Sequence, residues 1–286
     1  MNERQPSSSR GWIEITPRGV RYPAANLDHV VDRARRYGAQ IVYLTRLAIL
    51  DKTYGRTLGK LWIVLDPVLQ SVVFFVILSI IFNVNGTDVS FLSIYLLVNV
   101  WRLNGTLFNL APSLIAGYGS VLQQTNFPLE IVVLVQVLNQ LFLFSINFGI
   151  VLILMFLGKI YPTPVWVCLP LVLLTHLAFS MTVVLVFSLF GVVVRDFTQM
   201  APVLTQLWFY GSPVVYGMER IPEPARTLME WINPFVTIIP AYRHVLIEGK
   251  VPAISSLLLI LLGSLIALYV MSKYLDQARH RLYQYL

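Results

Sequence analysis

The chain has few of the residues that soluble enzymes use for chemistry. Its 286 residues include one cysteine and four histidines, and only 12% of them are charged. The one thiol, Cys168, cannot form an intrachain disulfide, and its apolar neighbours indicate a packed rather than a reactive side chain. The sequence contains no HExxH pattern, paired acidic cluster or Cys/His ligand set. It therefore predicts no catalytic residue and no metal site.

An energy source for transport is also missing. The nearest approach to a phosphate loop, Gly55 to Leu61, is one residue short of G-x-x-x-x-G-K and has leucine where a hydroxyl should bind magnesium. A proton-coupled carrier tends to place acidic or histidine side chains at mid-membrane depth, and only His176 lies well inside an apolar stretch. A lone histidine on an apolar helix is more often a structural residue. The sequence therefore predicts a membrane subunit that another polypeptide drives.

Apolar residues dominate what is present. Hydrophobic residues make up 57% of the chain, and the mean hydropathy is +0.71. Apolar stretches of membrane-spanning length predict an all-α membrane protein with six transmembrane helices per protomer. The predicted spans are residues 61–82, 91–116, 131–157, 165–194, 199–216 and 251–274.

The net charge of +7 is concentrated near the N-terminus, where 11 of the 21 Lys and Arg precede residue 61. Because cytoplasmic flanks of membrane spans carry an excess of positive residues, this distribution predicts that both termini are cytoplasmic. The partners that it indicates are anionic membrane lipids and not nucleic acid. The first 60 residues show no secretory signal pattern.

The predicted spans divide the chain into four parts. We expect a weakly ordered cytoplasmic tail over residues 1–25, an amphipathic helix with its connection over 26–60, the transmembrane domain over 61–274 and a cytoplasmic C-terminal tail over 275–286. The helix is predicted over Asp28 to Thr45 and along the cytoplasmic membrane surface. A helix packed on a soluble partner is the alternative.

Residues 217–250 are apolar but interrupted. Pro222 and Pro224 stop one segment from continuing the fifth span, and Asn233 before Pro234 breaks the chain again. Irregular backbone at membrane depth is tolerated only where protein buries it or where it lines a water-filled cavity. The pattern predicts two short re-entrant gate helices in the outer leaflet. A solvated extracellular loop without a gating role is the alternative.

The second span carries a charge at membrane depth. Arg102 lies there together with Asn99, Asn104 and Asn109. A buried arginine costs roughly 2.5 to 3.5 kcal/mol on insertion scales. Arg102 is therefore predicted to face an internal acceptor, water or a transport pathway.

Three stretches carry motifs in a recognisable order. The motif residues are Leu58, Gly59, Trp62 and Pro67 in TLGKLWIVLDP; Phe127, Pro128, Glu130 and Ile131 in TNFPLEI; and Arg195, Asp196, Ser212, Pro213, Val214, Asn233, Pro234, Tyr242 and Arg243 farther along. Over most of residues 45–252 the chain thereby resembles the type-2 ABC exporter permeases of the lipid-linked polysaccharide, O-antigen and polyol-phosphate export family. It departs from that pattern at residues 52–54 and 122–126, which concern how a partner docks.

The resemblance implies a homodimer of this chain bound to two copies of a separate ABC ATPase. The ATPase would bind Mg-ATP. This chain would be a permease subunit without a cofactor and without enzymatic activity. The substrate would be a lipid-linked glycan of O-antigen, capsule, teichoic-acid or galactan type, exported across the bacterial cytoplasmic (inner) membrane. A permease for a drug or small lipid, or a polytopic membrane transferase, is the alternative.

Three groups of candidate residues follow. Because sugar CH groups stack on aromatic faces, the substrate pathway is predicted at Trp101, Arg102, Trp208, Phe209, Tyr210 and Tyr216, with an aromatic belt at the membrane interface as the alternative. The gate is predicted at Ser212, Pro213, Trp231, Asn233, Pro234, Tyr242 and Arg243. Coupling to the ATPase is predicted at Arg33, Arg36, Gln124, Phe127, Pro128, Arg195 and Asp196, in segments that the topology places on the cytoplasmic side.

Overall fold

The computed structural model describes residues 14–16, 19–21, 37–51, 58–81, 90–118, 129–218 and 221–282. The chain divides into two units, residues 1–40 and 41–286. In the first unit, β1 (Glu14–Thr16) and β2 (Gly19–Arg21) pair antiparallel, with Ile15 opposite Val20. The composition of residues 1–25 predicts a weakly ordered tail, and this short hairpin is a feature that the composition does not indicate.

The second unit is helical, as expected for apolar segments whose backbone groups must hydrogen-bond internally when lipid surrounds them. Its elements begin with α2, which starts in the first unit and runs over Gly38–Asp51. They continue with η1 (Gly59–Leu61), α3 (Trp62–Val76), the π-helical η2 (Ile77–Ile81), α4 (Phe91–Gly117), α6 (Leu129–Leu157), η4 (Pro164–Cys168) and α7 (Leu169–Val193). The last elements are α8 (Phe197–Tyr210), α9 (Glu223–Ile232), α10 (Phe235–Arg243), the π-helical η6 (His244–Glu248) and α11 (Ile254–Leu282).

Five helices among the described residues are long and apolar enough to cross a membrane, so the chain is a multi-pass membrane protein. They cover residues 59–80, 91–117, 130–157, 164–193 and 254–275. These ranges agree with five of the six predicted spans to within a few residues.

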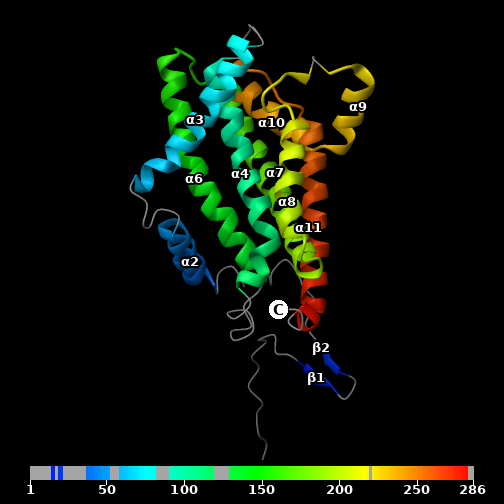
Figure 1. Cartoon of the computed structure of the whole chain (residues 1–286). Coiled ribbons are helices and arrows are strands. Elements are labelled where there is room, and N and C mark those ends of the chain that lie inside the picture. The colour runs from blue at the N-terminus through cyan, green and yellow to red at the C-terminus, as the bar shows by residue number, and fades with distance from the viewer. Residues whose placement is uncertain are drawn as a thin grey trace, which may run out of the picture. The chain divides into compact units, whose positions relative to one another are not determined.

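The fifth predicted span, residues 199–216, corresponds to α8, which is shorter than predicted. This helix has 14 residues, or about 21 Å at 1.5 Å per residue, whereas the hydrocarbon core is about 30 Å thick. It ends at Tyr210 because Gly211, Ser212 and Pro213 follow. In Figure 1, α8 nevertheless rises from the lower end of the helical unit, where α7 finishes, to the upper end, where α10 lies.

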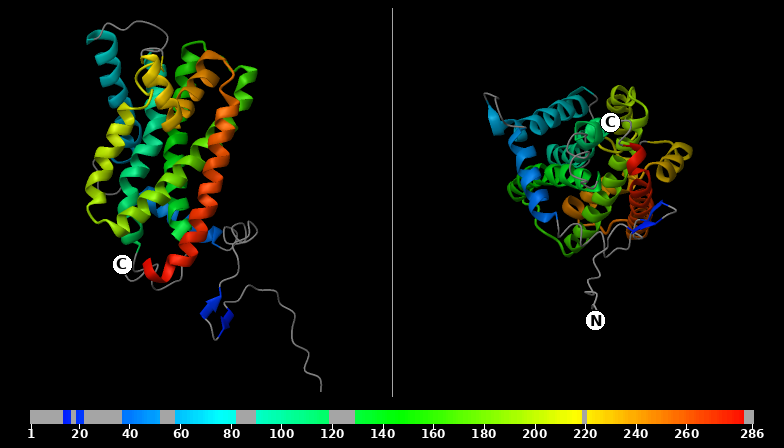
Figure 2. Two further views of the ribbon diagram at one scale, coloured as in Figure 1. Left: turned by 90° about the vertical axis from the view of Figure 1, so that its right-hand side faces the viewer. Right: turned by 90° about the horizontal axis from the view of Figure 1, so that it is seen from below.

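Helix α4 forms the centre of the helical unit. About 78% of its most apolar 18-residue window is buried, compared with 11% to 44% for the other four long helices. It contacts α3, α6, α7, α8 and α10 (Figures 1 and 2). Its start is fixed locally by Ser90, whose hydroxyl accepts a hydrogen bond from the Ser93 amide at 3.1 Å. Asn99 and Asn104 of the second span therefore lie inside the protein, whereas Arg102 is half-buried and Asn109 is exposed.

The closest approach between α4 and α7 depends on a glycine. A Cβ atom at Gly191 would overlap backbone atoms of Pro112 on α4. Any larger residue would force the two helices apart, so this glycine sets the packing distance near the lower end.

Residues 221–243 contain two short helices that differ in burial. On α9 the apolar side chains Leu228, Trp231 and Ile232 are exposed, and Trp231 is 84% exposed. On α10, by contrast, Phe235 and Tyr242 are almost completely buried. The chain turns between them at Asn233 and Pro234, where the proline rule predicts a break. One helix thus offers an apolar surface, while the other belongs to the core.

The predicted N-terminal helix can be compared only in part. Residues 22–36 lie outside the described residues, and α2 begins at Gly38 and continues to Asp51, beyond the predicted end at Thr45. At 14 residues it is too short to span a membrane. Val42, Tyr43 and Leu47 on this helix are exposed apolar side chains. A position along the membrane surface stays a prediction.

Candidate functional site

An aromatic cluster joins α4, α7, α8 and α10 at the upper half of the helical unit. The ring centroids of Trp208 and Phe235 are 5.1 Å apart, and Trp208 stacks on Phe108 at 5.4 Å. Trp101 lies 5.2 Å from Phe235 and 5.5 Å from Phe209. These contacts fix the rings in offset and edge-to-face arrangements typical of protein cores.

The residues predicted for the substrate pathway therefore fall into two groups. Trp101 and Phe209 are buried in the aromatic cluster, so their faces already contact other rings. Trp208 is half-buried, Tyr210 is exposed, and the half-buried Tyr216 donates its hydroxyl to the Tyr210 carbonyl at 2.8 Å. In this conformation the second group offers surface to a ligand, and a role in glycan passage stays a prediction for all of them.

Asn233 joins the end of α8 to the start of α10. Its Oδ1 accepts hydrogen bonds from the Trp208 indole at 2.9 Å and from the Phe235 amide at 3.1 Å. Its Nδ2 donates to the Gly211 carbonyl at 2.8 Å and to the Ser212 hydroxyl at 3.0 Å. Of the predicted gate positions, Ser212 and Asn233 bond to each other at this junction, whereas Pro213, Trp231, Pro234 and Arg243 line a second cavity.

A buried polar chain ties the far end of α10 to α7 and α4. The Tyr242 hydroxyl lies 3.0 Å from His176 Nδ1, and His176 Nε2 lies 2.6 Å from Asn104 Nδ2. The Ser180 hydroxyl donates to Asn104 Oδ1, which assigns Nδ2 as the donor to the histidine. His176 thereby accepts at Nε2 and donates from Nδ1. Both of its ring nitrogens have partners within the protein, as is expected of a structural histidine.

Arg243, the last predicted gate residue, belongs to a cluster of charges just beyond α10. Its Nε lies 2.9 Å from Glu248 Oε1, and Lys250 Nζ lies 2.9 Å from Oε2 of the same carboxylate. Burial alone would raise the pKa of Glu248, but the hydrogen bond from Lys250 and the charges of His244, Arg243 and Lys250 lower it below its usual value. The carboxylate therefore holds the positive groups of this turn together.

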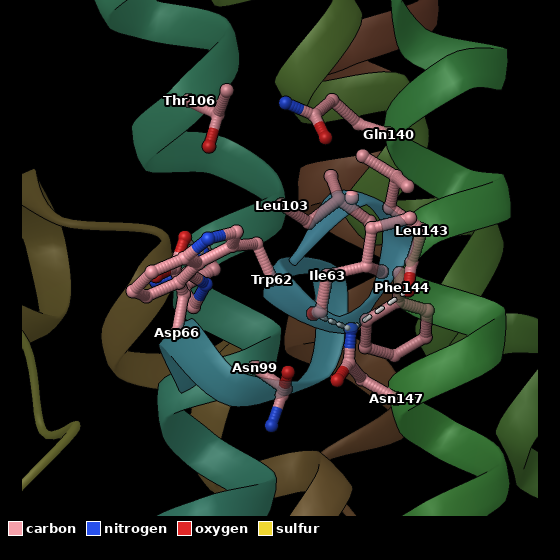
Figure 3. A pocket seen from close by; sticks show the side chains of 12 residues that line it. Trp62, Ile63, Asp66, Asn99, Leu103, Thr106, Gln140, Leu143, Phe144 and Asn147 are labelled. Atoms are coloured by element: carbon pink, nitrogen blue, oxygen red, sulfur yellow. Dashed lines mark hydrogen bonds and ion pairs between the residues drawn. The ribbon is translucent and has the colours of Figure 1, made fainter. Parts of the chain in front are cut away.

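A cavity of about 230 Å³, lined by both polar and apolar side chains, opens between α3, α4 and α6 at the depth of Arg102 (Figure 3). Arg102 donates to Gln70 Oε1 at 3.1 Å, and its Nη2 lies 3.9 Å from Asp66 Oδ2. These are the internal acceptors that the depth of the arginine requires. The lining residues are Gly59, Trp62, Ile63, Asp66, Asn99, Arg102, Leu103, Thr106, Gln140, Leu143, Phe144 and Asn147.

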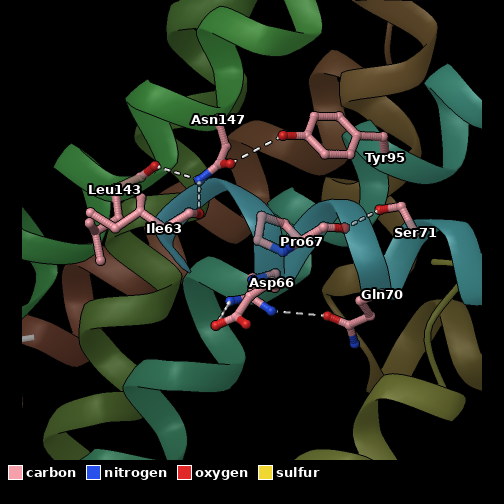
Figure 4. Close-up of polar contacts among 9 residues, drawn as sticks. Ile63, Asp66, Pro67, Gln70, Ser71, Tyr95, Leu143 and Asn147 are labelled. Carbon is pink, nitrogen blue, oxygen red and sulfur yellow. Dashed lines mark hydrogen bonds and ion pairs between the residues drawn. The ribbon is translucent and has the colours of Figure 1, made fainter. Parts of the chain in front are cut away.

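The cavity has a fixed wall. Asn147 on α6 donates from Nδ2 to the Ile63 carbonyl at 3.2 Å and to the Leu143 carbonyl at 3.0 Å. Its Oδ1 accepts from the Tyr95 hydroxyl at 3.1 Å (Figure 4). One side chain thus connects all three helices that surround the cavity.

The sequence contains a pattern that indicates this cavity, although none of the predictions above uses it. Trp62, Asp66 and Gln70 recur every four residues on one helix, which places them on the same face. The pairs Asn99 with Arg102 and Gln140 with Asn147 share a face in the same way. Polar residues at helical spacing on three consecutive spans are therefore the pattern that predicts such a cavity.

At the lower end, the turn between α7 and α8 carries Arg195 and Asp196, and both are exposed. The Asp196 carbonyl accepts hydrogen bonds from the amides of Gln199 and Met200, so it starts α8. The other residues predicted to couple to an ATPase, namely Arg33, Arg36, Gln124, Phe127 and Pro128, lie outside the described residues. The turn is open to a partner, and its role stays a prediction.

Within the described part of the chain, no group of three or more His, Cys, Asp or Glu could hold a metal ion. Cys168 is half-buried at the start of α7. What the geometry provides is a set of buried polar and aromatic contacts between helices, an apolar outer helix and a polar cavity at membrane depth.

Comparison with known proteins places this architecture in a family. Residues 39–247 match the sequence model of the ABC-2 type transporter family. A curated relative, the O-antigen export system permease protein RfbA of Myxococcus xanthus, is 25% identical over 246 residues, which cover 85% of this chain and 94% of the relative. A relative of the same name from Klebsiella pneumoniae is 24% identical over 73% of this chain and 80% of its own length. The family match covers well over half of the chain, which therefore belongs to the ABC-2 type transporters.

Proposed function

We propose that this chain is the transmembrane subunit of an ATP-driven exporter that moves a lipid-linked polysaccharide of the O-antigen type. The observation that carries the proposal is the similarity to O-antigen export permeases over 73% to 85% of this chain. The matched residues include α4, the aromatic cluster, the Asn233 junction and the buried chain from Asn104 to Tyr242. The similarity therefore covers the parts that build the interior, and not merely apolar composition.

The assembly that we propose is a homodimer of this chain with two copies of a separate ATPase that binds Mg-ATP. Family membership supports an ATPase partner, because ABC-2 type permeases are transport subunits. Helices α3 and α11 support a second copy, since only 11% and 17% of their apolar windows are buried within one protomer. Such surfaces fit contact with another chain or with lipid.

We further propose six membrane crossings with both termini on the cytoplasmic side of the bacterial inner membrane. The sixth crossing is α8, which rises from the lower to the upper end of the helical unit in Figure 1. The residues that follow Tyr210 complete the crossing that α8 begins. The excess of Lys and Arg before residue 61 supports a cytoplasmic lower end.

Helices α9 and α10 are proposed to gate the exit at the upper end. The exposed apolar side chains of α9 suit the outer leaflet, whereas α10 is anchored in the core. Single cysteines at positions 229–239, in a background without Cys168, test this role. They should be shielded at rest and become more reactive when the partner binds ATP; equal labelling in every state would refute the gate.

A transport assay tests the proposed function. Cells that lack this chain should accumulate lipid-linked polymer in the cytoplasm, and reintroducing the chain together with its ATPase should restore surface polymer. A variant of the ATPase that cannot hydrolyse ATP is the matched control. If surface polymer is unaffected by the loss of this chain while resistance to a drug changes, the alternative permease function is correct.

Charge reversal at Arg195 tests the proposed coupling surface. Arg195→Glu changes an exposed turn, so the chain should fold normally while ATPase co-purification or export falls. Lys159→Glu, an exposed change at the upper end, is the control. Unchanged assembly and unchanged export would remove the Arg195 turn from the coupling surface.

A further inference from the structure

The cavity around Arg102 extends beyond the groups that bond the arginine itself. Asp66 and Gln70 already serve as its acceptors, on the side of α3. Beyond them the cavity extends past Asn99 and Thr106 on α4 to Gln140 on α6. At about 30 Å³ per water molecule, its 230 Å³ hold roughly eight waters.

Polar side chains at membrane depth are costly unless they meet a polar partner. Here each of the three helices contributes polar side chains that border the cavity, and Arg102, Asn99 and Asn147 also bond to protein groups. Asn147 holds the helices at a fixed separation through its bonds to Ile63 and Tyr95 (Figure 4). The cavity is therefore built to keep a polar volume open.

The chemistry of the lining selects the kind of molecule that fits. Asp66, Asn99, Gln140 and Arg102 carry planar carboxylate, amide and guanidinium groups, which can bind two neighbouring hydroxyls at once. The half-buried Trp62 supplies an indole ring at the rim. Planar polar groups beside an aromatic ring match a sugar, which has hydroxyls around its edge and CH groups on its faces.

A phosphate group fits less well. Arg102 is the only cation among the lining residues, and Asp66 lies 3.9 Å from its Nη2. A phosphate that approached Arg102 would also approach this carboxylate, and the like charges would repel. A sugar hydroxyl, in contrast, can donate to Asp66 and accept from Arg102 together.

We propose that the cavity lined by Trp62, Asp66, Asn99, Arg102 and Gln140 is a binding subsite for a single sugar ring. A six-membered ring with its substituents has twelve heavy atoms and fits a volume of about 230 Å³. The inference rests on the proposed function, because it names a place in the membrane domain where one residue of the transported glycan is bound. The site lies apart from the aromatic cluster of Trp208 and Phe235.

Protection of a cysteine tests the site directly. The full chain with its ATPase is placed in lipid nanodiscs, with Thr106→Cys at the exposed rim of the cavity and Cys168→Ser elsewhere. The rate of reaction with a small methanethiosulfonate reagent is measured alone and with octyl glucoside, octyl galactoside or octyl mannoside below their micelle concentrations. Octyl phosphate and octanol share the alkyl chain and are the matched probes.

We expect at least one octyl glycoside to slow the reaction threefold or more, and octyl phosphate and octanol to leave it unchanged. A stronger effect of octyl phosphate would identify a phosphate site and overturn the proposal. Equal effects of all probes, no effect of any glycoside, or a cysteine that does not react even alone would overturn it as well.

Two variants link the protection to the named groups. Asp66→Asn, which removes a charged acceptor, and Trp62→Leu, which removes the aromatic face, should each raise the half-protecting concentration about tenfold, or about 1.4 kcal/mol. Ser145→Ala, an exposed change on α6, should not alter it. A glycoside effect that survives both cavity variants would place the binding elsewhere.

Export separates this inference from the proposed function. If cells with the unmodified chain export no polymer, the proposed function fails whatever the probes do. If they export normally and no glycoside protects the cysteine, the function stands and the sugar subsite is wrong.

Discussion

Substitution of Asn233 by alanine should strongly destabilise the junction between α8 and α10. The amide of Asn233 makes four hydrogen bonds, two as acceptor and two as donor. The residue is only 7% exposed, so water cannot readily replace its partners. Asn233→Ala leaves the Trp208 indole and the Phe235 amide as donors without an acceptor.

The magnitude follows from the number of bonds. Side-chain hydrogen bonds within a membrane protein average about 0.6 kcal/mol, and those in soluble proteins about 1 kcal/mol. Four bonds lost together therefore lower the free energy of unfolding by about 2 to 4 kcal/mol. Asn233→Asp retains an oxygen for Trp208 and Phe235 but turns a second, acceptor-only oxygen toward the Gly211 carbonyl in a buried position, so it should cost at least as much as Asn233→Ala.

Unfolding of the purified chain by sodium dodecyl sulfate in mixed micelles, followed by circular dichroism, measures this difference. Asn109→Ala on α4 is the matched control, because Asn109 is exposed and its removal should change the free energy by less than about 0.5 kcal/mol. A loss of less than about 1 kcal/mol for Asn233→Ala would refute the reasoning. It would mean that packing of the aromatic cluster, and not this amide, holds the two helices together.

Three further predictions concern other contacts. Gly191→Ala should cost about 1 to 3 kcal/mol of unfolding free energy because its methyl group meets the Pro112 backbone, whereas Gly263→Ala, which meets nothing within 4 Å, should be neutral in the same assay. Tyr242→Phe should cost about 1 kcal/mol, since it removes the hydrogen bond to the buried histidine of α7; an unchanged melting temperature would contradict this. Because the pKa of Glu248 is lowered in the folded chain, its contribution to stability is present above its usual pKa of 4.5 and is lost as the pH falls below it. The difference in stability between the wild type and Glu248→Gln should therefore shrink on acidification through that range.

The long spans could be predicted because apolar length is a strong signal. Five helices agree with the predicted ranges, and the break before Pro234 lies where the proline rule puts it. That Arg102 meets acceptors within the protein also follows from the free-energy cost of exposing an arginine to lipid. Each of these predictions depends on one segment and on the surrounding solvent, and needs no knowledge of which helices touch.

Predictions that depended on pairs of helices were less complete. The apolar pattern after Gln199 continues to Tyr216 and does not reveal that α8 ends at Tyr210 or that Gly211 and Ser212 bond to Asn233. The aromatic residues at 208–210 look equivalent in the sequence, but Phe209 faces Phe74 and Trp101 while Tyr210 is exposed. Such differences arise from neighbours on other helices, which a single sequence read in order does not identify.

Helix α8 offers a route by which we expect a movement of the Arg195–Asp196 turn at the lower end to reach α9 and α10 at the upper end. This helix starts at the exposed Arg195–Asp196 turn and finishes at Gly211, whose carbonyl accepts from Asn233. Pro202 near its start removes one backbone hydrogen bond, so bending is easiest close to the turn. The part above Pro202 is joined to α10 by the Asn233 amide and by the packing of Trp208 on Phe235, and these can move only together. Since Tyr242 anchors the far end of α10 to α7 and α4, we expect a displacement of α8 to turn α10 about that anchor and to move the exposed α9 with it.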